Sequence, residues 1–398
     1  MSKKYPTPLQ VLQLSCKICY NYLMERFVAV LGRQPLISVA ELESLFADVR
    51  LVAPNLAEFT SEKAPNIARL GGTLKLATPI DVSLEEFWQS LPENGKIVLG
   101  LSDFSRSANP YLTQREALRW KKYIAKTGRN VRVIPNKTAI LSSATSLHNK
   151  LFTDTHIELI KNGKRYYRVI AVQDIESYAR RDQSRPARDA KVGMLPPKLA
   201  QILINLCGDL SQGTRLLDPF CGTGVVLQEA ALMGYLPYGT DLSDRMVEYS
   251  ARNLDWLYEI HARLLPSARN NVVTAQGDAT SYTWQPPIDA VACETYLGPP
   301  MSLPPAEIKL KEAKQVCKSI VLGFLKNLSE QIETGTPVTI AVPAWLRPDG
   351  HYERLNLLDE IDNLRYNVVR FKNLGQKDLL YYRNGQVVAR EIIVLRKK

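Results

Sequence analysis

Residues 215–224 read RLLDPFCGTG, and the organisation of the chain follows from this stretch. A short apolar run leads into Asp218, a tight turn with Gly222 and Gly224 follows, and residues 225–233 favour a helix. This order is typical of a site for a nucleotide-like ligand, because glycine lets the backbone come close and the helix N-terminus offers free N–H groups. The stretch therefore predicts a ligand site at the end of a buried strand.

Strands and helices alternate downstream of this stretch. The expected strands are 236–241, 271–275, 288–293 and 337–342, and the expected helices are 243–258, 305–332 and 352–362. Such alternation predicts an α/β fold with a doubly wound, Rossmann-like parallel sheet over residues 213–398. Asn384-Gly385 lies between the last two expected strands, 367–372 and 387–395, and predicts a hairpin and an antiparallel edge.

The upstream part divides into two α+β units. The first, residues 25–95, contains an expected strand at 26–31 and two expected capping boxes, Ser38–Glu41 and Ser83–Glu86. The second, residues 96–180, contains a basic helix at 113–127 and expected strands at 131–135 and 166–172. Residues 181–212 are expected to be a proline-containing linker and lead-in helix, and residues 1–24 an N-terminal extension with Met24 as an alternative start.

Composition restricts the class of protein. At 398 residues, with 45% hydrophobic and 23% charged residues, the chain is typical of a globular protein with two or three domains. No apolar run reaches the roughly 18 residues of a membrane span, and no signal-peptide pattern is present, so we expect a cytoplasmic protein. Cys16 and Cys19 form a lone C-x-x-C without a second pair or nearby histidines, so no metal is expected.

Positive charge is concentrated upstream of the glycine-rich turn. Residues 106–198 hold 20 basic and 7 acidic side chains, whereas residues 213–398 hold 21 of each. A surface that binds a polyanion explains this asymmetry better than a uniformly solvated surface does. The basic side chains that we expect to contact RNA are Arg119, Lys122, Lys126, Lys150, Arg185 and Arg188.

Four acidic residues follow four successive expected strands: Asp218, Asp241, Asp278 and Glu294. Ligands of doubly wound sheets bind at the carboxyl ends of the strands, so these side chains are expected at one site. An acid four residues before the first glycine, Asp218, would repel a pyrophosphate but suits a cation. S-adenosylmethionine (SAM) is therefore favoured over NAD, with Asp241 at the ribose and Asp278 at the adenine amine.

The run DPFCGTGVVLQEAALMGYLPYGTDLSDRMVEYSARNL, 218–254, resembles the THUMP-containing tRNA guanine-N2 methyltransferases. RPARDAKVGMLPPKLAQ, 185–201, is similar to the same family, and weaker similarity covers residues 25–398. The resemblance implies a ferredoxin-like module, a THUMP domain that grips tRNA, and a class I methyltransferase domain. It leaves room for a small activator protein of unknown identity as a further partner.

The resemblance also assigns roles to residues of the cofactor site. Asp218, Gly222 and Gly224 are expected around the methionine moiety of SAM, and the Met194-Leu195-Pro196 segment is expected to cover the cofactor. Phe220 and Ala279, which lie in the same motifs, complete the expected set.

The sequence departs from the family at the expected catalytic motif. Where the family has Asp-Pro-Pro-Tyr after the fourth strand, this chain has Glu294-Thr295-Tyr296-Leu297, and a second register over Gly298–Met301 lacks both acid and ring. In the first register, Glu294 accepts a hydrogen bond from the target amine and Tyr296 stacks on an extruded base.

The leading hypothesis is a SAM-dependent RNA methyltransferase that acts on a guanosine amine in tRNA. The altered motif keeps open a non-catalytic RNA-binding protein, and a DNA amino-methyltransferase stays open because enzymes that methylate the amine of adenine use similar motifs.

Overall fold

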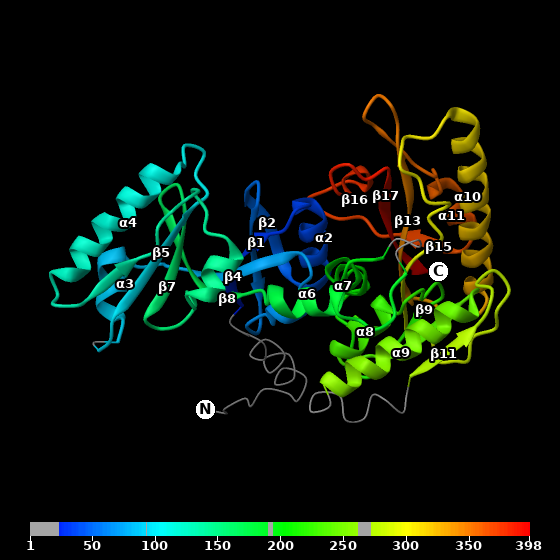
Figure 1. Ribbon diagram of the computed structural model, residues 1–398, viewed down its shortest axis with the longest axis horizontal. Coiled ribbons are helices and arrows are strands. Elements are labelled where there is room, and N and C mark those ends of the chain that lie inside the picture. Colours follow the sequence, from blue (N-terminus) through cyan, green and yellow to red (C-terminus); the bar gives the residue numbers. More distant parts are fainter. Residues whose placement is uncertain (1–23, 93, 190–193, 262–271) are drawn as a thin grey trace, which may run out of the picture.

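The structure is a computed structural model that describes residues 24–92, 94–189, 194–261 and 272–398. Within these ranges the chain forms two sheets that lie along the long axis of the molecule (Figure 1). The first sheet has eight strands from the upstream part, and the second has nine strands from the part downstream of the glycine-rich turn. The molecule is therefore built from two units, called here the N-terminal unit and the C-terminal unit.

The sheet of the N-terminal unit has the order β2-β3-β1-β4-β8-β7-β5-β6. Its strands are β1 (Glu25–Leu31), β2 (Ala47–Ala53), β3 (Leu56–Ser61), β4 (Thr73–Pro79), β5 (Ile97–Asp103), β6 (Val131–Val133), β7 (His156–Asn162) and β8 (Arg165–Val172). β4 pairs with β8, so strands from both sides of residue 95 belong to one continuous sheet.

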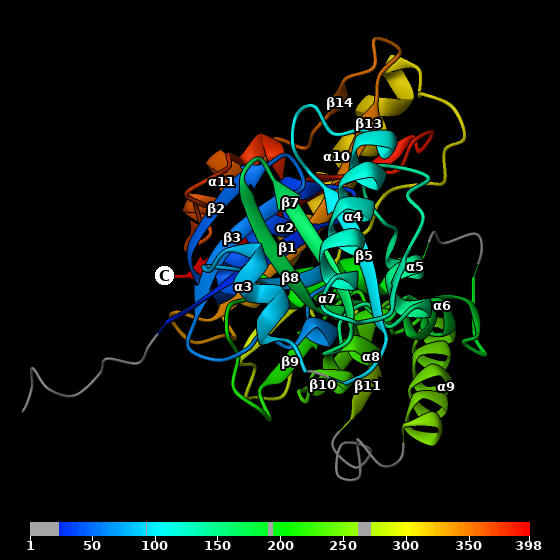
Figure 2. The ribbon, with the colours of Figure 1, turned by 90° about the vertical axis from the view of Figure 1, so that its left-hand side faces the viewer.

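Helices cover this sheet and connect its strands. They are α2 (Pro35–Leu45), η1 (Ile67–Arg69), α3 (Leu84–Ser90), α4 (Pro110–Ala125), α5 (Ser143–His148) and α6 (Ile175–Gln183). α3 and α4 bury their apolar faces in one cluster with β5 and β7, and Figure 2 shows both helices at this end of the sheet. The opposite face of α4 stays in solvent and carries the basic side chains.

Of the two capping boxes expected in the N-terminal unit, one is confirmed and one is wrong. The capping box at Ser83 and Glu86 is confirmed, since both of its hydrogen bonds form at the start of α3. The expected box at Ser38 is wrong, because α2 begins at Pro35 and Ser38 lies buried inside the helix. Proline suits the first helical position, where no backbone N–H is needed. Glu41 instead accepts hydrogen bonds from elsewhere in the fold.

β7 has no counterpart among the expected strands. Its sequence, HIELIKN, places Glu158 at a fully buried position, which interrupts the apolar alternation that marks a strand. Lys75 of β4 donates to Glu158 at 2.5 Å, and the hydroxyls of Ser102 and Ser146 donate to the same carboxylate at 2.6 and 2.5 Å. A charge is tolerated in the core here because its hydrogen bonds are made.

The sheet of the C-terminal unit has the order β11-β10-β9-β12-β13-β17-β15, and β14 and β16 add to β13 and β17. Its strands are β9 (Arg215–Asp218), β10 (Leu236–Asp241), β11 (Val273–Gln276), β12 (Ala290–Glu294), β13 (Pro337–Leu346), β14 (Tyr352–Glu353), β15 (Tyr366–Val368), β16 (Leu380–Tyr381) and β17 (Val388–Lys397). The doubly wound parallel sheet is confirmed. β9 pairs with β10 on one side and with β12 on the other, and the direction in which successive strands are added to the sheet reverses between β9 and β12.

The antiparallel strand lies one place inside the edge. β17 runs antiparallel to β13 and to β15, and β15 forms the border of the sheet. The Asn384-Gly385 turn joins the short β16 to β17, whereas the expected partner of the hairpin was the strand near 367–372. The turn therefore lies at the end of the sheet where β17 begins, beside the carboxyl end of β13.

Helices pack on both faces of this sheet. They are α7 (Pro197–Asn205), α8 (Val225–Leu232), α9 (Asp244–Ile260), α10 (Glu307–Ser329), α11 (Leu358–Asn363) and η3 (Gln376–Asp378). Val291 and Cys293 of β12 join the cluster under α10, while Ala290 and Ala292 join the cluster under α7 and α8. Strands buried on both faces explain why the sequence shows apolar runs here without alternation.

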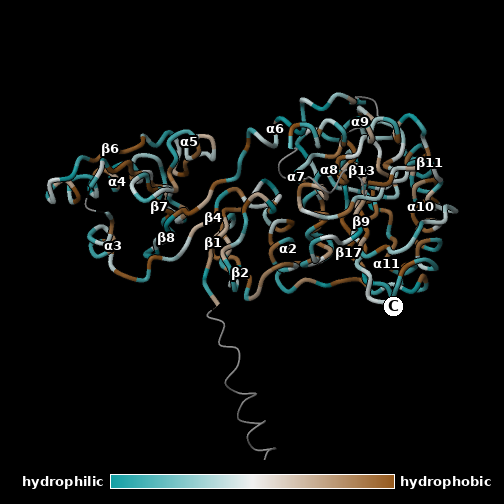
Figure 3. Tube along the Cα trace, turned by 90° about the horizontal axis from the view of Figure 1, so that it is seen from below, coloured by the Kyte–Doolittle hydropathy of each residue, from teal (hydrophilic) through white to brown (hydrophobic). Residues whose placement is uncertain are grey.

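The two units meet through α2. Ile37 and Ala40 of this helix belong to the same apolar cluster as Leu199 of α7, and Figure 3 shows α2 between the two sheets. Gly71 lies against α7 so closely that an added Cβ would be 2.1 Å from the Lys198 carbonyl oxygen. Such contact fixes the position of one unit against the other.

Candidate functional site

Asp218, the last residue of β9, is almost fully buried. Its Oδ1 accepts a hydrogen bond from the Phe220 N–H at 3.1 Å, and within the described ranges it has no cationic partner. Burial raises the pKa of Asp218 well above its usual range, and the carboxylates of Asp241 and Glu294 raise it further. Neither Asp218 nor Asp241 has a cationic partner in the described chain, so the site favours a cationic ligand.

The glycine-rich turn needs both of its glycines. Gly222 and Gly224 have φ of 51° and 78°, a region where a side chain is strained. A Cβ on Gly224 would also lie 2.9 Å from the Ser250 hydroxyl oxygen of α9. α9 holds the turn from behind, because Ser250 Oγ donates to the Gly222 carbonyl and Asn253 Nδ2 donates to the Thr223 carbonyl, both at 2.8 Å.

Asp241, the last residue of β10, joins this turn to the next strand. Its Oδ2 accepts from the Gly222 N–H at 2.8 Å and its Oδ1 from the Ser243 N–H at 2.9 Å. Burial raises the pKa of Asp241, although both hydrogen bonds act in the opposite direction. The next side chain, Leu242, is 69% exposed, and sequence reasoning did not single it out. A large apolar group left in solvent beside the expected ribose contact offers a surface to a flat heterocycle.

The third strand end is more open. Asp278 is exposed, and its Oδ1 accepts from the Thr280 N–H at 2.9 Å and from the Thr280 hydroxyl at 2.7 Å. Ala279 is buried, and its carbonyl accepts from Asn327 of α10 at 3.0 Å. The structure therefore brings Asp218, Asp241 and Asp278 to the same edge of the sheet, as their strand-end positions predicted.

Phe220 and Leu195, which were expected to contact the cofactor, pack against the protein core beside the site. The ring of Phe220 packs edge-on against Phe324 of α10, with centroids 5.2 Å apart. Leu195 is buried in the cluster with α7, and Pro196 directly precedes that helix. The expected cover, 194–196, is described in full, whereas residues 190–193 directly before it lie outside the described residues. The backbone of the preceding segment is held to α9, since Asn253 bonds to both the N–H and the carbonyl of Ala187.

Glu294 ends β12 and faces a partner that sequence reasoning missed. Arg390 of β17 donates from Nε to Glu294 Oε1 at 2.7 Å, and the two side chains are 4% and 14% exposed. Among the described residues Oε2 of Glu294 receives no hydrogen bond. The ion pair fixes the direction of the carboxylate and leaves one oxygen for a further donor.

The residues after Glu294 separate into an anchor and a projecting ring. Thr295 is buried, and both its N–H and its hydroxyl bond to the Ala341 carbonyl, at 3.0 and 3.2 Å. Tyr296 is 43% exposed at the same end of the sheet as Asp218. An exposed ring next to a fixed carboxylate is suited to contact a planar base.

The expected RNA contacts fall into three places. Arg119, Lys122 and Lys126 lie on the exposed side of α4 or just after it, and Lys150 lies exposed in a turn at φ 53°. Arg188 is exposed and donates to the Gln183 carbonyl at 3.1 Å.

Arg185 differs from the others because it is 3% exposed. Its Nη2 donates to the Met194 sulfur at 3.2 Å, while Nε and Nη1 have no partner within the described chain. Burial lowers the pKa of its guanidinium. In this conformation Arg185 does not present its charge on the surface, so a role as a surface phosphate contact does not fit its position.

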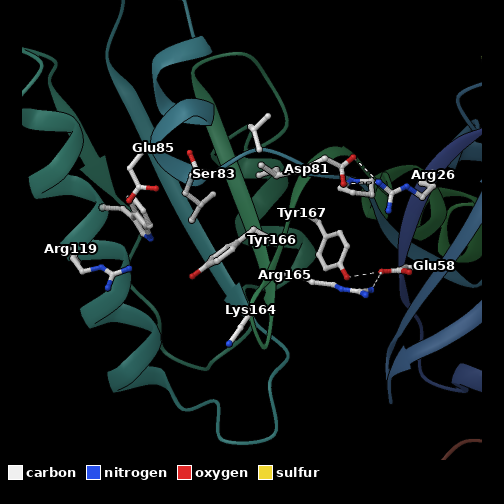
Figure 4. Close-up of a pocket in the computed structure, with 15 residues that line it drawn as sticks. Arg26, Glu58, Asp81, Ser83, Glu85, Arg119, Lys164, Arg165, Tyr166 and Tyr167 are labelled. Atoms are coloured by element: carbon white, nitrogen blue, oxygen red, sulfur yellow. Dashed lines mark hydrogen bonds and ion pairs between the residues drawn. The ribbon is translucent and has the colours of Figure 1, made fainter.

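A pocket of about 460 Å³ lies between α4 and the first strands of the N-terminal unit (Figure 4). Arg26 and Arg165 in this pocket are neutralised by Asp81 and Glu58, at 2.6 and 3.2 Å. Arg119 lines the same pocket and stacks over Trp120, with 5.1 Å from its guanidinium carbon to the ring centroid. The basic face of α4 therefore continues into a polar hollow.

The described residues contain no group of three or more His, Cys, Asp and Glu side chains arranged to hold a metal ion. Cys16 and Cys19 lie outside these residues, and the four cysteines within them are buried free thiols. None of the helices that the structure describes is long and apolar enough to cross a membrane.

Comparison with known proteins agrees with the geometry of the C-terminal unit. Residues 185–295 match the family model described as "RMKL-like, methyltransferase domain". The matched range runs from the buried Arg185 through the glycine-rich turn to Thr295, and so contains each of the four strand-end acids.

Curated relatives cover part of the chain. A tRNA (guanine(10)-N2)-dimethyltransferase of Methanothermobacter thermautotrophicus is 31% identical over 154 residues, which are 39% of this chain and 40% of the relative. A protein of the same name from Pyrococcus abyssi is 34% identical over 151 residues, 37% of this chain and 40% of the relative. The chain thus matches about two fifths of the length of these relatives.

Among solved structures, TrmN from Thermus thermophilus aligns over 94% of this chain and 100% of its own, with 16% identity and a TM-score of 0.48.

Proposed function

We propose that the protein is a SAM-dependent RNA methyltransferase that modifies the exocyclic amine of a guanosine in tRNA. The observation that carries this proposal is the buried carboxylate of Asp218 at the glycine-rich turn, which has no cationic partner in the described chain. The names of the two relatives above support the substrate, and the matched methyltransferase domain supports the reaction.

The residues present fit SAM. Its ammonium and sulfonium groups supply the positive charge that Asp218, with Asp241 and Glu294 nearby, lacks. The turn carries no side chain at Gly222 or Gly224, so its backbone can come close to a ligand. Asp241 presents carboxylate oxygens to ribose hydroxyls. We assign Asp278 and the backbone at Ala279 to the adenine end. Met194, Leu195 and Pro196 are assigned to the cover of the site.

SAM supplies an activated methyl group when it is bound. The chain's own task is then to align the target amine, since a guanine amine is a weak nucleophile. We assign this task to Glu294, whose Oε2 is free to accept one N–H of the amine while Oε1 stays with Arg390. Tyr296 is assigned to stacking on the base once it has left its own stack.

The N-terminal unit is assigned to RNA binding. The segment 106–198 carries a net positive charge of 13, and α4 exposes Arg119, Lys122 and Lys126 along one side. Phosphate contacts of this kind position a nucleic acid and do not read its sequence. A THUMP-like domain within residues 96–180, a ferredoxin-like module at 25–95, a cytoplasmic location and a small activator protein remain parts of this proposal.

Methyl transfer from radiolabelled SAM to tRNA of a deletion strain tests the proposal. We expect label in this tRNA with the wild-type protein and background counts with Asp218→Ala. Nucleoside mass spectrometry of the same tRNA then identifies the base and the number of methyl groups. No transfer by the wild type, or equal transfer by Asp218→Ala, contradicts the proposal.

The altered motif at Glu294–Leu297 favours a second candidate, an RNA-binding protein that kept the fold without activity. Calorimetry with SAM separates the active methyltransferase from the inactive RNA-binding protein. An inactive domain is not expected to retain SAM binding that depends on Asp241. Micromolar SAM binding that Asp241→Ala abolishes argues against the second candidate. Competition between tRNA and duplex DNA at a fixed salt concentration tests the DNA amino-methyltransferase alternative.

A further inference from the structure

A second pocket, of about 450 Å³, lies between the segment before α7 and the start of β17. Its lining includes Arg188 and Gln183 from the segment before α7, Arg383 and Gln386 from the Asn-Gly turn, and Arg390 from β17. A volume of this size accommodates a nucleotide-sized group. Since Arg390 also bonds to Glu294, the pocket and the expected catalytic carboxylate share one side chain.

The charge of the pocket is positive and only partly neutralised. Three arginines line it against one acidic residue, Asp182. Arg188 and Arg383 form no ion pair with any described residue, and Arg188 bonds only to a backbone carbonyl. Arg390 uses Nε for Glu294, and its two terminal nitrogens have no protein partner within the described chain. Guanidinium groups with free N–H bonds at one concave site are the usual protein ligands for phosphate.

We propose that this pocket binds a backbone phosphate next to the target nucleoside, with Arg390 contacting the phosphate through its terminal nitrogens and Glu294 through Nε. The proposal rests on the proposed function and adds a subsite to it. Its consequence is that the same guanidinium orients the carboxylate and senses whether an RNA phosphate is in place. Arg188 and Arg383 then contact the phosphate from the two sides of the pocket.

Another anion could have the same chemistry, the carboxylate of the methionine moiety of SAM. Position in the sheet argues for the RNA phosphate. Asp218 ends β9, and Arg390 lies on β17, three strands away in the order β9-β12-β13-β17. Adjacent strands are about 4.8 Å apart, which places the two backbones roughly 14 Å from each other. Arg383, Gln386 and Arg390 thus border the pocket on the side away from β9, while Arg188 and Met194 border it on the side of the expected cover of SAM.

Removal of single charges from the pocket tests the proposal. Arg383→Gln and Arg188→Gln change exposed side chains that hold no other charged group, so folding is expected to be unaffected. Lys326→Gln is the matched control, because this exposed lysine near the C-terminal end of α10 lies at the opposite end of the sheet. Binding of unmodified tRNA is measured by filter retention with S-adenosylhomocysteine present, at four salt concentrations, and SAM binding is measured by calorimetry.

We expect each pocket variant to weaken tRNA binding about tenfold at low salt and to reduce the slope of log K against log salt by about 1. SAM affinity stays within twofold of the wild type, and Lys326→Gln changes neither quantity. An unchanged slope in both pocket variants overturns the proposal. Weaker SAM binding with unchanged tRNA binding also overturns it, and assigns the pocket to the carboxylate of SAM.

These binding measurements do not depend on methyl transfer. Suppose that the wild type transfers no methyl group, but the pocket variants bind tRNA more weakly and with a smaller salt dependence. This result contradicts the proposed function and supports phosphate binding in the pocket. Suppose instead that the wild type methylates tRNA and the pocket variants bind tRNA as the wild type does. This result supports the proposed function and contradicts phosphate binding in the pocket.

Discussion

Asn205 of α7 donates a hydrogen bond to Glu41 of α2 at 2.7 Å, and so joins the two units through a fully buried carboxylate. The N–H groups of Gly71 and Gly72 donate to the same carboxylate at 2.9 and 2.8 Å. No cation accompanies Glu41 within the described chain. The interface between the units therefore contains a charge that is held only by neutral donors.

This arrangement predicts a pH-dependent stability. Burial raises the pKa of Glu41 from 4.5 to about 7, although its three hydrogen bonds act in the opposite direction. Between pH 4.5 and about 7 the folded state holds the proton of Glu41 and the unfolded state releases it. The folded state therefore loses stability relative to the unfolded state as the pH rises through this range. The difference in unfolding free energy between Glu41→Gln and the wild type should therefore shift by about 3 kcal/mol in favour of the variant over this window. Urea unfolding at pH 4.5, 6 and 7.5 measures it, and a difference that stays constant contradicts the prediction.

The contact of Gly71 with α7 predicts a second effect on stability. Gly71→Ala would place a Cβ 2.1 Å from the Lys198 carbonyl oxygen, so the units must separate or shift. We expect a loss of about 3 kcal/mol, at the upper end of the cost of overpacking. Gly375→Ala is the control, since its Cβ would meet nothing closer than 3.7 Å. Thermal unfolding compares the two, and equal midpoints contradict the prediction.

Asp218 links stability to cofactor binding. Because burial and then its acidic neighbours raise the pKa of Asp218, ionising it destabilises the ligand-free protein as the pH rises through that pKa. Asp218→Asn cannot ionise, so we expect the ligand-free variant to gain thermal stability over the wild type with increasing pH. The same change should weaken SAM binding by about 10- to 100-fold, the usual range for a lost charged hydrogen bond.

The wild-type affinity for SAM is expected to rise with pH over the same window, because the carboxylate form binds the cation. Calorimetry over the pH range in which the ammonium of SAM stays protonated measures this, and Asp218→Asn is the reference that lacks the titration of Asp218. An affinity for SAM that falls with pH in the wild type contradicts this account of the site.

Tyr296 is expected to act on the RNA and not on the cofactor. Stacking of a base on an aromatic ring contributes about 1–3 kcal/mol, so Tyr296→Ala should lower kcat/KM for tRNA by about 10- to 100-fold. Tyr296→Phe keeps the ring and should retain most of the activity. SAM affinity is expected to be unchanged in both variants. Leu303→Ala, which truncates another exposed apolar side chain, is the control.

The buried guanidinium of Arg185 is expected to lower the stability of the ligand-free protein. Its buried Nε and Nη1 lack partners in the described chain, and replacing such a charge by an apolar side chain of similar size often stabilises a protein by about 1–3 kcal/mol. We expect Arg185→Met to raise the unfolding free energy of the ligand-free protein. A loss of stability instead would mean that the guanidinium has structural partners. SAM and tRNA binding measured on the same variant show whether a ligand uses this group.

Local patterns predicted the C-terminal sheet well because its features lie close together in sequence. Asp218, the two glycines and Asp241 occupy 24 consecutive residues, and each strand end was visible as an acid after an apolar run. Arg390 could not be found in this way. It lies 96 residues after Glu294, and only the placement of β17 beside β13 brings the two together.

The N-terminal unit was harder to predict for a related reason. β7 contains a buried Glu158, which is acceptable only because Lys75, 83 residues away, supplies the opposite charge. The start of α2 was misplaced because Ser38 and Glu41 match a capping box in sequence, whereas Glu41 bonds across the interface to Gly71, Gly72 and Asn205. In both cases the deciding interaction is between residues that no local pattern connects.

The packing of α2 against α7 has a consequence for how such a molecule selects its target. α4 lies at one end of the molecule and α10 at the other, and the units between them share an apolar core (Figure 1). A nucleic acid held by the first unit would meet Glu294 at one set distance. Under the proposed function, the nucleotide to be methylated would then be chosen by its distance along a folded RNA from the part that the first unit binds, with little need to read the sequence of bases.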